Sequence, residues 1–387
     1  MTSFAERVDA TTIDQLLARA SCKWATFGDA IGAWVAEMDF GLAEPISAAL
    51  ARMDADLLYG YPNPSMVTGL RTATADFLAS RYGWSVEPSM VAELSDVLTG
   101  LGVVIADFTP EGAPIVVLTP AYMPFMTIPE AFGRELVQVP MTQDADRWVL
   151  DETALTAALT PGSLLVLANP FNPIGKVWTR LELQRLSEIV DAAGARVFSD
   201  DIHAPLTFEG YSHVPYASVN EVAAAHTVTA VSASKAWNLA GLKCAQLIFS
   251  NPDDLSVWKK KARRRAAEAS NPGIIAGTAA YREGLPWLTD ALAYLDVNRR
   301  LVADELPRLV PGARLSDLQG TYLQFVDFRD TGLPGNPRQF LYEHARIAVT
   351  DGDLCGDAGH GFVRMNLATP TPVLRQILDR IGAAVPS

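Results

Sequence analysis

The stretch Val228-Thr-Ala-Val-Ser-Ala-Ser-Lys235 leads from an apolar segment through two serines to a lysine. Eight residues further on, Lys243 precedes a second apolar run that extends to Phe249. A lysine at the end of a strand, beside small hydroxyl residues, is suited to form an imine with an aldehyde cofactor. We therefore expect Lys235 to carry the chemistry of this protein, although its spacing alone also fits an ordinary solvated lysine.

The composition is that of a globular protein that binds small molecules. The chain has 387 residues, of which 49% are hydrophobic, so one large domain and a smaller one can both form a core. Its net charge of -13 disfavours a nucleic-acid surface, because phosphate binding needs a basic field. The basic run 259–265 can bind anions in principle, but it is explained more simply as a solvated helix face.

The cysteines and the apolar runs indicate where the protein resides. Cys22, Cys244 and Cys355 are far apart and form no CxxC pair, so neither a disulfide framework nor a metal site is predicted. A reducing cytoplasm fits this pattern. No run approaches 18 apolar residues, and the first residues lack an apolar leader, so we expect an unexported protein without a membrane partner.

Apolar strands alternate with helical patterns through the middle of the chain. The expected strands are Ile115–Leu118, Leu164–Ala168, Val197–Phe198 and Thr227–Val231, and the expected helices include Thr12–Arg19, Ser65–Tyr82 and Trp287–Glu305. Such alternation predicts an α/β fold with a mostly parallel sheet flanked by helices. We expect 46–280 to form the large domain and 281–387 a smaller α+β domain, which the segment 1–45 joins. Within that segment, residues 33–40 are expected to form a strand or an extended stretch.

Reactive side chains follow the expected strands. Ligands bind beyond the carboxyl ends of parallel strands, so these positions are the candidate site. In chain order they are Tyr122, Asn172, Asp200, Asp201, His203, Ser232, Ser234 and Lys235. Farther along, Arg364 interrupts an apolar run, and a buried charge of this kind needs an anionic partner from the protein or from a ligand.

Four motifs occur in a fixed order along the chain. They are Asn172-Pro-Ile-Gly175, Ser199-Asp-Asp-Ile-His203, Ser232-Ala-Ser-Lys235 with Gly241-Leu-Lys243, and Phe362-Val-Arg364. Together they resemble the motifs of fold-type I pyridoxal-phosphate enzymes of the aminotransferase class I/II family, from about residue 30 to about residue 370. The segments 34–40, 59–61 and 280–287, together with His203, resemble more narrowly the MalY/PatB-type cystathionine β-lyases, which are C–S lyases.

This resemblance implies pyridoxal 5'-phosphate as the cofactor and assigns a role to each motif residue. Lys235 would bind the cofactor covalently and later act as the base that removes the Cα proton of the substrate. Asp200 would pair with the pyridine nitrogen, and Tyr122 would stack on the ring. Asn172 and His203 would donate hydrogen bonds to the phenolic oxygen.

The resemblance also implies a phosphate site. Ser232, Ser234 and Lys243 would supply donors and charge, together with a helix that begins at Asp96, Val97 and Leu98. Asp96 departs from the small residue that is usual in the family. Because an acid would repel the phosphate, Asp96 must either point away or cap its own helix.

The remaining implied contacts concern the substrate and a second subunit. Arg364 would hold the α-carboxylate of an amino-acid substrate in a bidentate contact, assisted by Asn172 and the backbone near Ala36. Tyr61 would reach the phosphate of the neighbouring subunit. The resemblance therefore implies a homodimer with shared active sites.

The expected activity is a C–S β-lyase that converts cystathionine or a related cysteine S-conjugate to a thiol, pyruvate and ammonia. An aminotransferase is the alternative, because it uses the same lysine, aspartate and arginine. A cofactor-bound regulatory protein with little turnover is a third hypothesis. A nicotinamide dehydrogenase is disfavoured, since no GxGxxG opens a helix after a strand.

Overall fold

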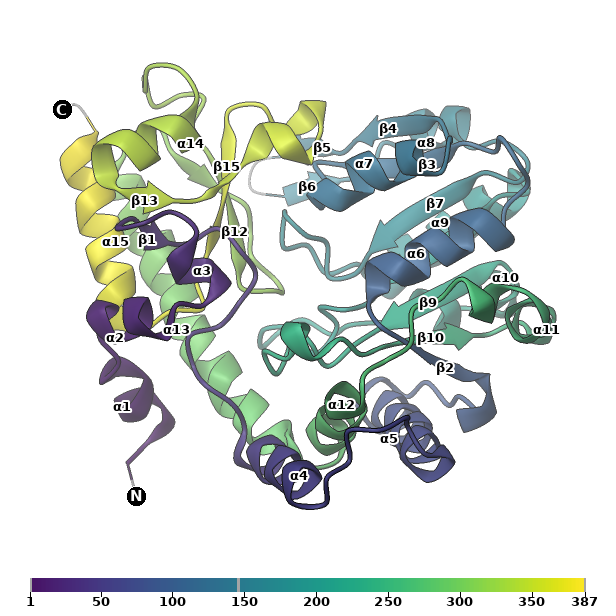
Figure 1. Cartoon of the computed structure of the whole chain (residues 1–387). Coiled ribbons are helices and arrows are strands. Elements are labelled where there is room, and N and C mark those ends of the chain that lie inside the picture. Colours follow the sequence, from purple (N-terminus) through teal and green to yellow (C-terminus); the bar gives the residue numbers. More distant parts are fainter. Residues whose placement is uncertain (1, 145–146, 386–387) are drawn as a thin grey trace.

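A seven-stranded sheet lies at the centre of the computed structural model, which describes residues 2–144 and 147–385 (Figure 1). In spatial order its strands are β2 (Val91–Leu94), β10 (Ala245–Phe249), β9 (Thr227–Val231), β8 (Arg196–Asp200), β7 (Leu164–Ala168), β3 (Ile115–Thr119) and β4 (Leu136–Pro140). Neighbouring strands are parallel except at β10, which is antiparallel to both β2 and β9. The predicted mostly parallel sheet is therefore confirmed, with one reversed strand that the pattern did not reveal.

Helices cover both faces of this sheet. They include α5 (Pro64–Tyr82), α6 (Val97–Asp107), α7 (Met123–Ala131), α9 (Arg180–Ala192) and α12 (Asn271–Glu283). Leu78 of α5 packs with Ile248 of β10 on one face. Successive strand side chains point to opposite faces, so Leu247 meets α6 on the other, where a Cβ on Gly100 would lie only 3.0 Å from the Leu247 side chain. The glycine thus lets α6 approach the sheet closely.

A second, four-stranded sheet forms from the C-terminal part of the chain. Its strands, in order, are β11 (Arg314–Leu315), β12 (Leu323–Asp327), β15 (Phe362–Asn366) and β14 (Thr350–Asp351), and the helices α13 (Leu285–Leu309) and α15 (Thr371–Ala384) accompany it. Near the N-terminus, β1 (Ile31–Gly32) pairs in parallel with β13 (Ile347–Ala348). The N-terminal segment therefore lies against the C-terminal region (Figure 1). The domain limits at 45 and 280 stay predictions.

A strand or an extended stretch is expected at residues 33–40, and the structure shows no strand there. Only Ile31 and Gly32 pair as a strand, and the chain beyond them bends. The reason is that side chains satisfy its backbone groups: Asn366 Nδ2 donates to the carbonyls of Val35 and Glu37 at 2.6 and 2.7 Å. These carbonyls accept hydrogen bonds from a side chain instead of from a neighbouring strand. The local sequence does not indicate this conformation.

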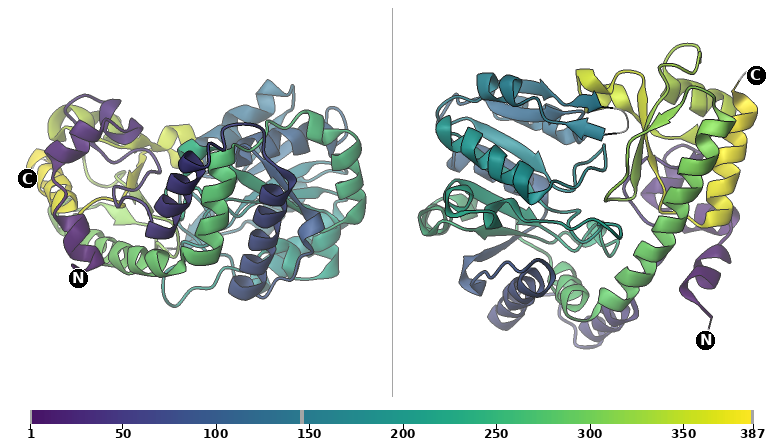
Figure 2. Two further views of the ribbon diagram at one scale, coloured as in Figure 1. Left: turned by 60° about the horizontal axis from the view of Figure 1, so that its bottom comes forward. Right: turned by 180° about the vertical axis from the view of Figure 1, so that it is seen from behind.

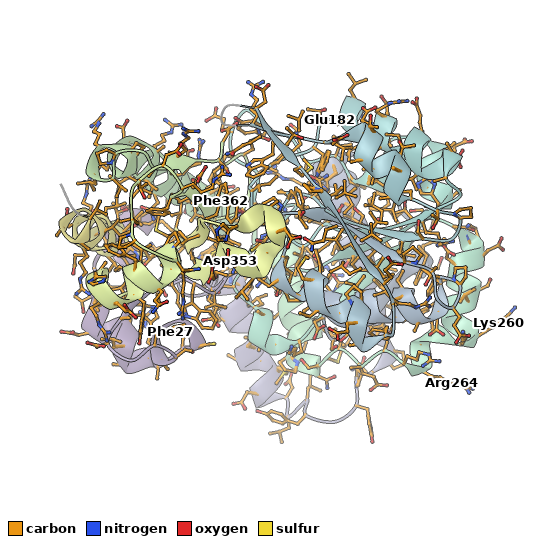
Figure 3. All side chains as sticks on the ribbon, turned by 90° about the horizontal axis from the view of Figure 1, so that it is seen from above. Phe27, Glu182, Lys260, Arg264, Asp353 and Phe362 are labelled. Carbon is orange, nitrogen blue, oxygen red and sulfur yellow. The ribbon has the colours of Figure 1, made fainter. Side chains whose placement is uncertain are left out.

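The predicted helices are present. They correspond to α2 (Ile13–Arg19), α5 and α13, of which α13 extends beyond the expected range at both ends. The helix α4 (Glu44–Ala55) lies beside α12, and α5 lies on the other side of α12 (Figure 2). Lys260 and Arg264 of the basic run are exposed at the outer edge of the molecule (Figure 3), which agrees with a solvated face. Among the described residues, none of the helices combines the length and apolar character needed to cross a bilayer.

Candidate active site

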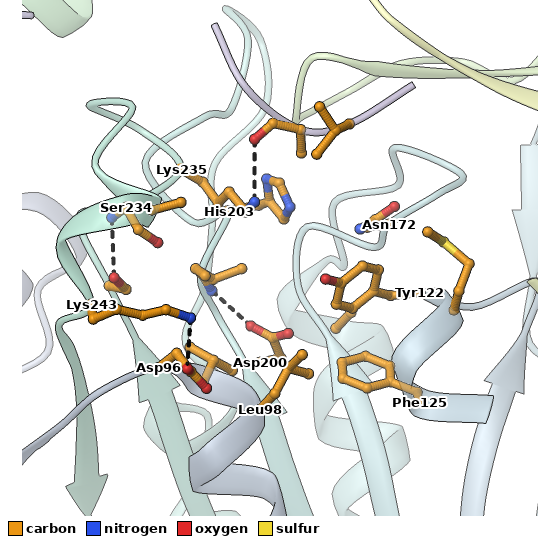
Figure 4. Close-up of a pocket in the computed structure, with 18 of the residues that line it drawn as sticks. Asp96, Leu98, Tyr122, Phe125, Asn172, Asp200, His203, Ser234, Lys235 and Lys243 are labelled. Atoms are coloured by element: carbon orange, nitrogen blue, oxygen red, sulfur yellow. Dashed lines mark hydrogen bonds and ion pairs between the residues drawn. The ribbon is translucent and has the colours of Figure 1, made fainter. Parts of the chain in front are cut away.

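The carboxyl edge of the large sheet opens into a cavity of about 370 Å³. Every predicted cofactor or substrate residue except Tyr61 lines it: Ala36, Asp96, Val97, Leu98, Tyr122, Asn172, Asp200, His203, Ser232, Ser234, Lys235, Lys243 and Arg364. Figure 4 labels Asp96, Leu98, Tyr122, Asn172, Asp200, His203, Ser234, Lys235 and Lys243 among them. The reversed direction of β10 explains the presence of Lys243. Because β10 is antiparallel to β9, its first residues lie at the edge where β9 ends, so Lys243, which precedes β10, lies near Ser232 and Ser234.

Lys235 lies deep in this cavity. Its Nζ donates to the backbone oxygen of Ala36 at 3.2 Å. Burial, aided by the nearby positive charge of Arg364, lowers the pKa of Lys235 to about 8. A lysine of this kind holds an appreciable fraction of neutral, nucleophilic amine near neutral pH. The structure thus separates Lys235 from an ordinary solvated lysine.

Asp200 is the last residue of β8 and lies on the floor of the cavity (Figure 4). Its Oδ1 accepts a hydrogen bond from the amide of Ile202 at 3.1 Å. Burial raises the pKa of Asp200 to about 7, and the neighbouring charge of Asp201 acts in the same direction. A buried carboxyl group with such affinity for a proton is suited to share one with a basic ring nitrogen.

We predict a pH-dependent contribution of Asp200 to the stability of the ligand-free protein. Its folded-state pKa of about 7 lies above the ordinary value of 3.8, so the folded protein binds the proton more tightly than the unfolded chain. The stabilisation is complete below the ordinary value and is lost as the pH rises through about 7. Between these two pH values the free energy of unfolding should therefore fall with pH, and Asp200→Asn should remove up to about 1.4 kcal/mol per pH unit from this slope.

Urea denaturation of the ligand-free protein between these two pH values measures this effect. The matched control is Asp304→Asn, which removes a carboxylate that is 77% exposed and should leave the slope in place. An unchanged slope in Asp200→Asn would contradict the raised pKa.

Arg364 of β15 is fully buried and has only neutral hydrogen-bond partners within the described part of the chain. Its Nη1 donates to Asn172 Oδ1 at 3.1 Å, and its Nη2 donates to the oxygen of Trp34 at 3.0 Å and to Thr350 Oγ1 at 3.2 Å. The buried Nε has no partner. Of the two anions that the sequence left open, the ligand is therefore the one that the structure favours, since an isolated buried charge is costly.

Lys243 and Asp96 lie together on one side of the cavity, and Asn172 and Tyr122 lie on the other (Figure 4). Asp96 Oδ1 accepts from the amide of Thr99 at 2.8 Å and so caps α6. The prediction that Asp96 caps its own helix is confirmed. Its Oδ2, however, does not point away, because it forms an ion pair with Lys243 Nζ at 3.2 Å.

The Ser232 hydroxyl makes two hydrogen bonds within its own part of the chain. Ser232 Oγ donates to the oxygen of Cys244 at 2.7 Å and accepts from the amide of Ser234 at 3.1 Å. This hydroxyl therefore shapes the loop that carries Lys235. The first-turn amides of α6, at Val97 and Leu98, have no partners within the helix and add donors at the same side of the cavity.

His203 and Tyr122 complete the wall. Burial and the nearby charges of Lys235 and Arg364 hold the pKa of His203 well below its usual value, so the ring is neutral at neutral pH. Its Nδ1 is buried and has no hydrogen-bond partner among residues 2–144 and 147–385. Burial also raises the pKa of the Tyr122 hydroxyl, which keeps that group protonated.

Two contributors to the site were missed by the sequence reasoning. Tyr322 donates its hydroxyl to the oxygen of Ala36 at 3.0 Å, the same oxygen that Lys235 contacts. Thr350 contacts Arg364, as described above. Tyr322 directly precedes β12, and Thr350 belongs to β14. No local sequence pattern around either residue indicates that it contributes to the site.

Tyr61 does not line this cavity. Its side chain is 94% exposed, and it borders a separate surface hollow with Arg71 and Trp258. Its predicted contact with the cofactor of a neighbouring subunit therefore stays a prediction that concerns a second chain.

Comparisons with known proteins agree on one family. The chain matches the family aminotransferase class I and II over residues 36–381. It is 36% identical to a cystathionine β-lyase of Corynebacterium glutamicum, over 96% of this chain and 99% of that protein. It is 31% identical to the cystathionine β-lyase PatB of Bacillus subtilis, over 96% and 98%. The structure of cystalysin from Treponema denticola, which contains pyridoxal 5'-phosphate, superposes with a TM-score of 0.91 at 26% identity, over 97% and 98% of the two chains.

Proposed function

Because the chain belongs to the aminotransferase class I and II family, we propose that it is a pyridoxal-phosphate-dependent C–S β-lyase. Its substrate would be cystathionine or a related cysteine S-conjugate. The observation that carries this proposal is the meeting of Lys235, Asp200 and Arg364 in one cavity. The lyase names of the relatives from Corynebacterium glutamicum and Bacillus subtilis support this activity over that of an aminotransferase.

The residues of the cavity fit pyridoxal phosphate. Asp200 suits a pyridinium nitrogen, because its buried carboxyl group has a raised proton affinity and accepts a hydrogen bond from the backbone amide of Ile202. Lys243 and the start of α6 offer charge and amides for a phosphate. The unpartnered Nδ1 of His203 can contact a polar atom of the ring. When bound, the cofactor supplies an aldehyde for the Lys235 amine and a heterocycle that accepts electrons from Cα.

The chain's own groups would bind the substrate and move its protons. Arg364 would bind the α-carboxylate, for which its buried guanidinium has no competing carboxylate among the described residues. The Lys235 amine, with its lowered pKa, would take the Cα proton and could return it to a leaving group. For cystathionine, the products are homocysteine, pyruvate and ammonia, and one water molecule is consumed.

Incubation with L-cystathionine in the absence of any keto acid tests this proposal. We expect pyruvate and free thiol in equal amounts, measured by a lactate-dehydrogenase-coupled assay and by thiol titration. Product that appears only after a keto acid is added as an amino-group acceptor would identify an aminotransferase instead. A protein that binds pyridoxal phosphate without turnover of any amino acid would favour the regulatory hypothesis.

We also propose that the protein is a cytoplasmic homodimer. Support for the dimer comes from a cluster of exposed apolar side chains, Leu57, Tyr59 and Tyr61, which are 75%, 63% and 94% exposed. The three free cysteines support a reducing compartment. Sedimentation equilibrium that gives the mass of a single chain at micromolar concentration would contradict the dimer.

A further inference from the structure

The cavity contains a carboxylate at the side where the proposed function needs to bind a phosphate. Asp96 Oδ2 lies 3.2 Å from Lys243 Nζ, and its Oδ1 occupies the amide of Thr99 at the start of α6. Burial alone would raise the pKa of Asp96, but the bonds from Thr99 and Lys243 together hold it below the usual value. Asp96 is therefore an anion at neutral pH.

The charges that line the cavity show why this matters. Among the described lining residues, Lys235 and Arg364 are assigned to other parts of the ligand, so Lys243 is the cation left for the phosphate. Asp96 neutralises that cation. A phosphate at this place would meet a lysine together with a carboxylate, and the repulsion between like charges a few ångströms apart is appreciable in a partly buried site.

The main chain of Lys243 is held in place beside Asp96, although the Lys243 side chain is 60% exposed. Lys243 has φ +51°, in the left-handed region that side-chain-bearing residues rarely adopt. Its carbonyl accepts from the amide of Ser270 at 3.1 Å. The adjacent Leu242 packs so closely that a Cβ on Gly273 would lie 2.4 Å from the Leu242 oxygen. A phosphate bound at this side would therefore depend on the same lysine that Asp96 pairs with.

We propose that Asp96 is a built-in competitor of the cofactor phosphate. It occupies Lys243 and the Thr99 amide when the cofactor is absent, and it weakens cofactor binding and speeds cofactor release. The inference rests on the proposed function, because that function supplies the phosphate. It makes Asp96 a determinant of cofactor affinity rather than of the reaction.

The test compares Asp96→Asn with the wild-type protein. Asparagine caps helices as well as aspartate does, so the change removes the charge and keeps the cap. We expect the dissociation constant for pyridoxal phosphate to fall about tenfold and its release to slow, measured by equilibrium dialysis and by the absorbance of released cofactor. Pyridoxal, which lacks the phosphate, should bind both proteins equally. The concentration of inorganic phosphate that protects the cofactor-free protein from heat should also fall about tenfold.

Asp151→Asn is the matched control. Asp151 caps α8 (Glu152–Ala158) through the amide of Ala154 at 2.9 Å, and it does not line the cavity. This variant loses the same charge at the same kind of position, and its affinities should equal those of the wild type.

The outcomes are distinct. Asp96→Asn with unchanged or weaker affinity for pyridoxal phosphate would overturn the inference while the proposed function stands. An equal gain for pyridoxal would also overturn it, because the effect would not depend on the phosphate. A wild-type protein that binds no pyridoxal phosphate would overturn both. If Asp96→Asn does not fold, Asp96→Ser provides a second neutral cap with the same expected results.

Discussion

Pyruvate formation from L-cystathionine should fall by at least about 10³-fold in Lys235→Ala, because general-base catalysis by a positioned amine is lost together with covalent binding of the cofactor. The amine contacts Ala36 inside the cavity and has a pKa lowered to about 8, so its removal takes away the nucleophile and base at this position. The visible absorption of the bound cofactor should also change, since that absorption depends on the bond to the lysine. Coupled assays and absorption spectra of purified protein measure both effects.

Lys176→Ala is the control for this prediction. Lys176 also follows a strand of the large sheet, but its Nζ pairs with Glu182 at 2.7 Å and it does not line the cavity. Its removal breaks an ion pair that lies outside the cavity, so it should leave pyruvate formation within about twofold. Comparable activity in Lys235→Ala and Lys176→Ala would show that Lys235 is not the catalytic amine.

Of the substitutions considered for stability, Lys23→Met should lower the free energy of unfolding most. The Lys23 and Asp39 side chains are 0% and 5% exposed and pair at 2.7 Å, and Lys23 also donates to the oxygen of Ala368 at 3.1 Å. Removal of the lysine leaves Asp39 buried with Trp24 Nε1, at 2.9 Å, as a neutral donor. A buried pair broken on one side costs about 3–5 kcal/mol of the free energy of unfolding.

A double variant separates the broken pair from the lost packing. Lys23→Met combined with Asp39→Leu removes both charges, and it should recover part of the loss in urea denaturation. The exposed pair Arg308 and Asp304, at 74% and 77% exposure, is the control, and Arg308→Met should cost less than about 1 kcal/mol. If Lys23→Met lowers the free energy of unfolding no more than Arg308→Met does, the buried pair does not stabilise the fold.

Strand positions and most cavity residues could be predicted because they obey local rules. The apolar runs that end at Ala168 and Val231 coincide with β7 and β9, since parallel strands buried on both faces are continuous in hydrophobicity. The motif residues that follow β7, β8 and β9 then meet because parallel strands place their carboxyl ends at one edge. Roles such as the pairing of Asp200 with a ring nitrogen came from the family resemblance, not from spacing.

The parts that could not be predicted depend on contacts distant in sequence. β10 runs antiparallel to both of its neighbours. A continuous apolar run is expected for a buried strand of either direction, so the sequence of β10 does not indicate its direction. The bend of residues 33–40 depends on Asn366, more than 320 positions away. Tyr322 and Thr350 reach the site from the second sheet in the same way, so their own neighbourhoods carry no signal.

The carbonyl of Ala36 accepts hydrogen bonds from both Lys235 and Tyr322. It belongs to the main chain, and every amino acid at position 36 supplies the same oxygen. Side-chain substitutions at position 36 therefore test the space around the Ala36 side chain, but they do not remove this acceptor. Replacement of the following amide by an ester would weaken that oxygen as an acceptor and make its share of amine positioning measurable.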